Sequence, residues 1–117
     1  MKRIFLAAAF VFADAGAAFA HAQLQSASPP VGATVSPPGE IRLTFSEGVE
    51  PKFCGVTVVS ASGAAQAVGR PSVAPGNDKT LVVRLGKTLA PGAHTVKWRA
   101  VSVDMHRTQG EFDFTVK

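Results

Sequence analysis

The chain of 117 residues has no tyrosine, one tryptophan and a single cysteine, Cys54. A domain with one cysteine can form no internal disulfide, so packing must hold its core together. Basic residues exceed acidic ones by only four, and no run of lysine or arginine occurs. Binding to nucleic acid is therefore not indicated. Beyond the first twenty residues we find no helical period, no internal repeat and no low-complexity tract.

The first twenty residues have the pattern of a secretory signal peptide. Lys2 and Arg3 precede an apolar stretch at residues 4–13, and the Ala-Phe-Ala of residues 18–20 fits the small-x-small cleavage rule. The apolar stretch is short for a membrane anchor, which is the alternative interpretation. We expect cleavage before His21 and secretion of the mature chain. Residues 21–117, with ten basic and seven acidic side chains, then form one small domain.

Alternating apolar residues predict an all-β domain. Residues 40–47, 80–85 and 111–116 alternate with period two, residues 53–60 and 93–103 form further strands, and a weak edge strand surrounds Leu24. Residues 107–110 read as a turn, and residues 66–73 remain ambiguous because Pro71 interrupts them. Turns recur roughly every 8–12 residues, which is typical of an all-β sandwich or barrel. We predict a single-domain β-sandwich of about seven strands in two antiparallel sheets.

Two chemically capable side chains are predicted to be structural. Cys54 stands at the start of an apolar strand, so we expect a small buried residue there, and a copper-ligand role is the less favoured alternative. His94 shares a strand face with Val96, Trp98 and Ala100. This position predicts a core histidine that bonds to a backbone carbonyl.

The other two histidines could bind a metal together with an aspartate. Asp104 and His106 lie two residues apart after the longest strand, so on extended chain their side chains would point the same way. By itself this pair is a weak signal, and Asp104 could simply form a turn. Cleavage before His21 would add an α-amine and an imidazole that chelate one ion. Nitrogen and oxygen donors in tetragonal geometry favour Cu(II), with Zn(II) held less tightly.

Several segments resemble the CopC family of periplasmic copper-resistance proteins. They are the start at residues 21–24, the proline-rich segment at residues 28–35, the strand at residues 41–47, and the block at residues 98–116. The resemblance covers essentially all of residues 21–117. It implies a seven-stranded β-sandwich with a cupredoxin- or immunoglobulin-like Greek key. It also implies one Cu(II) per mature chain, with His21, Asp104 and His106 as ligands. Glu47 resembles an acid that serves some members as a further ligand or outer-shell group.

Two positions depart from the family pattern. Met105 stands where the family usually has glycine between the aspartate and the histidine, which bears on the shape of this loop. The mature chain also lacks the methionine-rich stretch of members that bind Cu(I), so it resembles the members with a Cu(II) site alone. Cu(I) binding by Met105 is not favoured.

The leading hypothesis is a monomeric periplasmic copper carrier or buffer, not an enzyme. The resemblance also implies delivery to an inner-membrane partner of CopD type. One alternative is a metal-free immunoglobulin-like interaction module, which fold alone does not exclude. A small copper oxygenase is the other alternative, and it is disfavoured because the chain is short and has few aromatic residues with which to bind a polymer.

Overall fold

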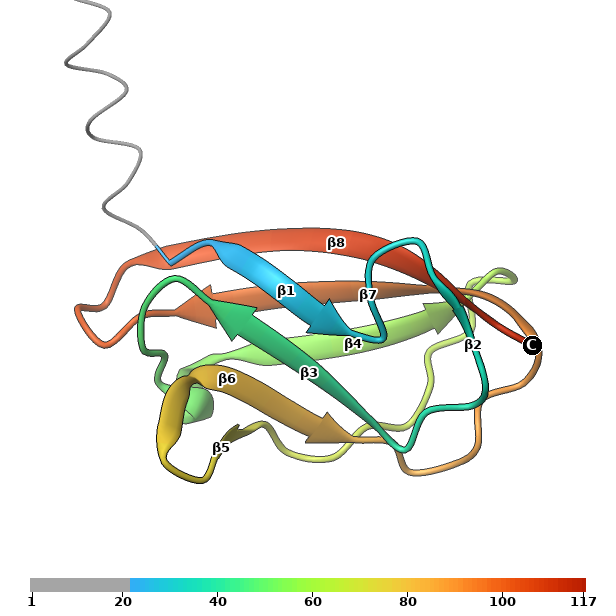
Figure 1. Ribbon diagram of the computed structural model, residues 1–117, viewed down its shortest axis with the longest axis horizontal. Coiled ribbons are helices and arrows are strands. Elements are labelled where there is room, and N and C mark those ends of the chain that lie inside the picture. The colour runs from blue at the N-terminus through green and yellow to red at the C-terminus, as the bar shows by residue number, and fades with distance from the viewer. Residues whose placement is uncertain (1–21) are drawn as a thin grey trace, which may run out of the picture.

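A computed structural model describes residues 22–117 and shows two sheets packed face to face (Figure 1). The predicted signal peptide, residues 1–20, and His21 lie outside the described residues. One sheet has the strand order β1-β3-β6-β5, and the other has the order β2-β8-β7-β4. We call them the β3 sheet and the β7 sheet. The all-β sandwich predicted from the sequence is confirmed.

The described chain contains eight strands, one more than predicted. They are β1 (Leu24–Ser28), β2 (Thr34–Val35), β3 (Glu40–Phe45), β4 (Gly55–Ser60), β5 (Ser72–Ala74), β6 (Asn77–Arg84), β7 (Gly92–Val101) and β8 (Arg107–Val116). The strand β2 is only two residues long and pairs parallel to β8, whereas the other pairs are antiparallel. A short 3-10 helix, η2 (Pro51–Phe53), precedes β4. Within residues 22–117 no helix is long and apolar enough to cross a membrane.

The alternating pattern places large apolar side chains between the sheets. Ile41, Leu43 and Phe45 of β3 are fully buried, as are Val96 of β7 and Val58 of β4. Each buried side chain of this size contributes roughly 1.5–3 kcal/mol through its removal from water. Because alternate residues of a strand face opposite sides, the same pattern leaves polar residues on the two outer faces.

Trp98 links the two sheets, as its position on the inner face of β7 predicted. Its indole meets the Phe45 ring edge to face, with the ring centroids 5.2 Å apart. Trp98 pairs across the hairpin with Gly110 of β8. A Cβ added at Gly110 would lie 2.7 Å from the indole Cζ2. Gly110 therefore leaves the space that the indole ring occupies.

Several strand boundaries differ from the predictions. Residues 107–110 do not form a turn but begin β8, because their backbone pairs in register with Val101 to Trp98 of β7. Polar residues followed by glycine suggested a turn, yet here the glycine accommodates Trp98. The strand predicted from Phe53 begins instead at Gly55, since Phe53 closes η2. The strand predicted at residues 80–85 begins earlier, because β6 starts at Asn77.

His94 is a core residue, as predicted. It is 3% exposed, and its Nε2 lies 2.8 Å from the Ala90 carbonyl oxygen. The ring stacks on Phe114 with the centroids 5.7 Å apart. These contacts bury the His94 ring and give this residue a role in packing.

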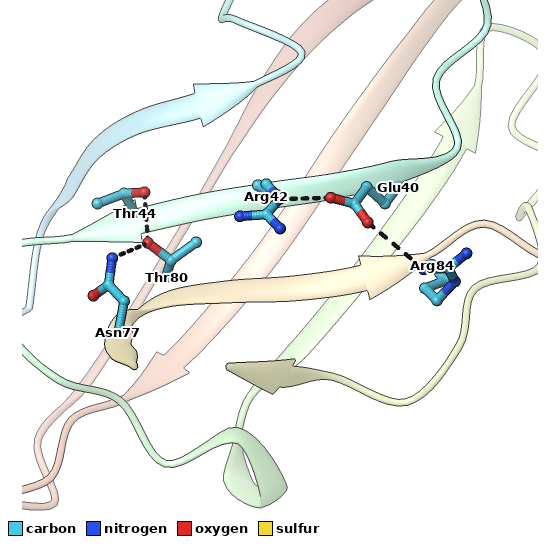
Figure 2. Close-up of polar contacts among 6 residues, drawn as sticks. All are labelled: Glu40, Arg42, Thr44, Asn77, Thr80 and Arg84. Atoms are coloured by element: carbon cyan, nitrogen blue, oxygen red, sulfur yellow. Dashed lines mark hydrogen bonds and ion pairs between the residues drawn. The ribbon is translucent and has the colours of Figure 1, made fainter. Parts of the chain in front are cut away.

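The outer face of the β3 sheet is polar and internally paired (Figure 2). The Arg42 Nε donates to Glu40 Oε2 at 2.5 Å, and Arg84 Nη1 lies 3.9 Å from the other oxygen of the same carboxylate. Further along, the hydroxyls of Thr44 and Thr80 are 3.0 Å apart. Two arginines thus share one carboxylate, so each of these cations has an acidic partner.

The contact between Trp98 and Gly110 predicts the effect of one added methyl group. Gly110→Ala should lower the free energy of unfolding by about 1–3 kcal/mol, because the new Cβ would overlap the indole ring. Gly39→Ala is the matched control, since no atom lies within 4 Å of the added Cβ there. Urea denaturation followed by tryptophan fluorescence measures both. Equal destabilisation of the two variants would show that the indole does not lie over Gly110.

Candidate functional site

A tight turn joins β7 to β8 at one end of the sandwich and carries both predicted ligands. Ser102 N donates to the His106 carbonyl oxygen at 2.9 Å, and Met105 N donates to the Ser102 carbonyl oxygen at 2.8 Å. The two bonds close the chain over residues 102–106. We call this segment the hairpin turn. It stands at the left of Figure 1, between the end of β7 and the start of β8.

Asp104 and His106 meet at the surface of this turn. The His106 Nδ1 lies 3.2 Å from Asp104 Oδ2, and the two side chains are 48% and 51% exposed. The prediction that the two residues lie on extended chain was wrong, because Asp104 lies in a turn. The turn nevertheless brings the two side chains together. In this arrangement they can both donate to one metal ion, or the carboxylate can orient the imidazole that binds it.

Ser102, which the sequence analysis missed, supports this pair from below. Its side chain is fully buried, and its hydroxyl donates a hydrogen bond to Asp104 Oδ1. The same hydroxyl oxygen accepts the backbone N–H of His106 at 3.2 Å. One buried side chain thus holds both residues. The sequence feature that could have identified Ser102 is its position between Val101 and Val103 at the end of an apolar strand.

Hydrogen bonding keeps Asp104 ionised. The Ser102 hydroxyl, and to a smaller extent His106, hold the pKa of the Asp104 carboxyl below its ordinary value. Because the pKa is lowered on folding, this contribution to stability is present above the ordinary carboxyl pKa. It is lost as the pH falls through the folded value. At neutral pH the turn therefore presents a carboxylate anion beside an imidazole.

Met105 adopts the backbone conformation of a glycine. Its φ is +69°, in the left-handed region, and it is the only residue other than glycine between 22 and 117 with a positive φ. This conformation costs an L-residue about 1–2 kcal/mol. The turn thus keeps the shape suited to glycine at this position, and the hydrogen bonds of Ser102 offset the strain. The Met105 side chain points outward and is 60% exposed.

The three residues of the turn that carry hydroxyl, carboxylate and imidazole groups do not form a hydrolytic triad. In a triad the serine hydroxyl bonds to the imidazole, which in turn bonds to the carboxylate. Here the Ser102 hydroxyl bonds to Asp104 and is buried, so no substrate can reach it. The geometry supports ligand binding at Asp104 and His106, and not acyl transfer.

The start of the described chain lies at the same end of the sandwich. Gln23 and Ser46 exchange two hydrogen bonds of 2.8 Å each, and Ala22 is buried in the core. Two residues beyond Ser46, the Gly48 carbonyl oxygen accepts the Val103 N–H at 3.0 Å. The backbone that begins at Ala22 is thereby tied through residues 46–48 to the hairpin turn.

Glu47, the further candidate ligand, does not join this pair in a metal cluster within the described residues. Among residues 22–117 no three His, Cys, Asp or Glu side chains form a cluster suited to a metal. Glu47 is half-buried, in the segment that bonds to both Gln23 and Val103. His21, the third predicted ligand, lies outside the described residues.

Cys54 is a buried packing residue, as predicted. Its thiol donates to the Glu50 carbonyl oxygen at 3.2 Å, and its sulfur accepts the Val101 N–H at 3.4 Å. Burial raises the pKa of this thiol above its ordinary value. The thiolate that would bind copper is therefore disfavoured.

Comparison with known proteins agrees with the fold. The CopC domain family matches residues 24–117. Copper resistance protein C of Escherichia coli is 36% identical over an alignment that spans 100% of this chain and 98% of the relative. The crystal structure of CopC from Methylosinus trichosporium OB3b superposes with a TM-score of 0.77 at 30% identity, covering 83% of this chain and 94% of that one. PcoC of E. coli, a methionine-rich copper resistance protein, gives 0.75 at 33% identity, covering 84% and 100%.

The chain therefore belongs to the CopC family. This result confirms the resemblance drawn from residues 21–47 and 98–116. The assignment is to a class of copper-resistance proteins and not to a class of enzymes.

The buried hydroxyl of Ser102 is predicted to set the pKa of Asp104. Ser102→Ala should raise this pKa towards the ordinary carboxyl value, because it removes the hydrogen bond that stabilises the carboxylate most. Carbon-detected NMR titration of the side-chain carboxyl measures it. Ser62→Ala, which removes only a surface bond to Ser60, is the matched control. An unchanged Asp104 pKa in Ser102→Ala would contradict the assigned role.

The Cys54 thiol should be unreactive in the folded protein. A folded pKa above the ordinary 9.0 means that stability is fully present below that value and declines as the pH rises through the folded pKa. We expect slow alkylation by iodoacetamide at pH about 8, and fast alkylation after unfolding in urea. Rapid modification of the native protein would show that Cys54 is accessible.

Proposed function

We propose that this protein is a periplasmic Cu(II)-binding protein that carries or buffers copper in resistance or homeostasis. Membership of the CopC family and the names of the relatives support copper as the cargo. The observation within the chain that supports a metal site is the exposed pair of Asp104 and His106, 3.2 Å apart on a turn held by Ser102. One Cu(II) per mature chain is proposed.

The proposed ligands are His21, Asp104 and His106. His21 precedes Ala22, which is buried at the end of the sandwich that carries the hairpin turn, and consecutive Cα atoms are only about 3.8 Å apart. Signal cleavage before His21 would free an α-amine, whose nitrogen chelates a metal together with Nδ1 of the same residue. These nitrogens, an imidazole nitrogen of His106 and an oxygen of Asp104 form a donor set that favours Cu(II).

The proposed site prefers Cu(II) to Cu(I). Soft sulfur ligands stabilise Cu(I), and PcoC is described as methionine-rich. This chain has only Met1 and Met105, and the buried thiol of Cys54 is kept protonated. Binding of the α-amine displaces a proton, since a free α-amine has a pKa near 8. Copper affinity should therefore fall in acid.

Copper delivery to an inner-membrane protein of CopD type is part of the proposal and rests on the family alone. The exposed position of the hairpin turn supports transfer, because a partner can approach Asp104 and His106 without local unfolding. Glu47 would serve as an outer-shell group or an additional ligand. A monomer is sufficient for this function, since every proposed ligand comes from one chain.

The decisive experiment compares two N-termini. Protein that starts at His21 should bind a single Cu(II) with a tetragonal, nitrogen-rich electron paramagnetic resonance spectrum. One extra residue before His21 should weaken binding at least about tenfold, because the amine becomes an amide and the chelate ring is lost. Equal binding by both proteins would exclude the amine as a ligand. Absence of binding by both would favour the metal-free interaction module.

A second test concerns the carboxylate. Asp104→Asn should weaken Cu(II) binding by roughly 10–100-fold, whether Asp104 binds the ion or orients His106. The control is Asp113→Asn, which changes an exposed carboxylate that accepts the Thr95 hydroxyl at 2.7 Å on the same sheet. Copper titration of both variants by competition with a chelator gives the comparison. If the two variants bind equally well, Asp104 has no part in the site.

A further inference from the structure

The outer face of the β7 sheet is hollowed beside the hairpin turn. The hollow has a volume of about 600 Å³, and its lining includes Phe53 of η2, Val101 of β7 and Met105 of the turn. Arg99, Arg107 and Gln109 stand at its sides. It lies on the opposite side of this sheet from the core, because Arg99 and Val101 alternate with the inward-facing Trp98 and Ala100.

The hollow exposes apolar surface that folding has left uncovered. Phe53 is 51% exposed and Met105 is 60% exposed, while Val101 beneath them is buried. Four large apolar residues are exposed among residues 22–117, and only Val31 comes from outside η2 and the hairpin turn. Exposed apolar residues are ordinarily scattered singly over a protein surface. A group of them in one place is typical of a contact surface.

The cations Arg99 and Arg107 stand at the sides of the hollow, and Lys52 of η2 precedes Phe53 of its lining. Lys52, Arg99 and Arg107 form no ion pair with a carboxylate of residues 22–117. The Lys52 ammonium instead lies 5.9 Å from the centre of the Phe53 ring. On the outer face of the β3 sheet, by contrast, Arg42 and Arg84 share Glu40 (Figure 2). Both arginines of the β3 sheet therefore have a carboxylate partner, whereas Arg99 and Arg107 of the β7 sheet have none among residues 22–117.

Gly55 leaves space for the guanidinium group of Arg99, one of these cations. It pairs across the strands with Arg99, and a Cβ added at Gly55 would lie 2.5 Å from the guanidinium carbon. The guanidinium therefore rests flat on the β4 backbone at the edge of the hollow. Holding the group in place reduces the entropy that a partner would have to remove, and its planar donors suit a carboxylate.

We propose that this hollow docks a polypeptide segment in which acidic residues flank one large apolar side chain. The apolar side chain would sit between Phe53 and Met105, and carboxylates would pair with Arg99 and Arg107. Arg99 and Arg107, with Lys52 nearby on η2, favour an acidic partner by charge complementarity, and an anchor residue in a pocket is the usual centre of such an interface. A concave surface is better suited to receiving an inserted side chain than to contacting a membrane.

The proposal does not depend on the copper site. None of its contacts involves Asp104 or His106, although Met105 belongs to the same turn. Docking at the hollow would place a partner next to that turn. The test is therefore made on copper-free protein, so that its failure and failure of copper binding are distinguishable.

The probe is an acetylated, amidated peptide, EDLFDE, added to nitrogen-15-labelled protein. Amide shifts should be confined to the hollow and its sides, at Phe53, Arg99, Met105 and Arg107, and should weaken as salt is raised. The peptide KKLFKK, with the same apolar centre, should cause no such shifts. Equal shifts with both peptides, or none with EDLFDE, would overturn the proposal.

Charge reversal at the hollow provides the matched comparison. Arg107→Glu should weaken EDLFDE binding at least about tenfold, while Arg84→Glu, the same change on the other sheet, should leave it unchanged. Phe53→Ala should weaken binding, and Val31→Ala, which trims another exposed apolar residue, should not. Equal effects of Arg107→Glu and Arg84→Glu would mean that net charge and not the hollow attracts the peptide. Shifts at the hollow with phosphatidylglycerol vesicles but not with EDLFDE would assign it to a membrane and overturn the proposal.

Discussion

The contact between the inner faces of the two sheets is the constraint on which the rest of the structure depends. With one cysteine and no disulfide, the chain has only packing to hold it. Phe45 of the β3 sheet meets Trp98 of the β7 sheet edge to face, and Gly110 leaves room for the indole. This packing fixes β7 and β8 in register. The register in turn sets where the hairpin turn begins and ends.

The hairpin turn shows how a rigid sheet positions a surface site. Ser102 is anchored in the core, and its hydroxyl reaches both Asp104 and the His106 backbone. Met105 accepts a left-handed backbone between them. The two functional side chains remain exposed while the atoms that orient them are buried. A metal arriving at this turn would meet donors that are already ordered, which lowers the entropic cost of binding.

The two outer faces of the sandwich are chemically different. On the β3 sheet Glu40 is shared by two arginines, so both of these cations have a carboxylate partner. On the β7 sheet, Arg99 and Arg107 stand beside exposed Phe53 and Met105 without a carboxylate partner. Metal binding and partner docking would then occupy adjacent surfaces at one end of the molecule. The fold itself does not require the proposed docking surface on the β7 sheet. We therefore assign that surface to an interaction.

The sequence by itself determined the all-β class and the core residues, because apolar residues with a period of two give each strand one face that must be buried. It also indicated Asp104, His106 and the structural role of His94. Only the tertiary structure decided that residues 107–110 pair as strand, that Ser102 supports the site, and that Phe53 and Met105 meet at one hollow. These features depend on cross-strand register and on contacts between residues distant in the chain, which local patterns do not encode.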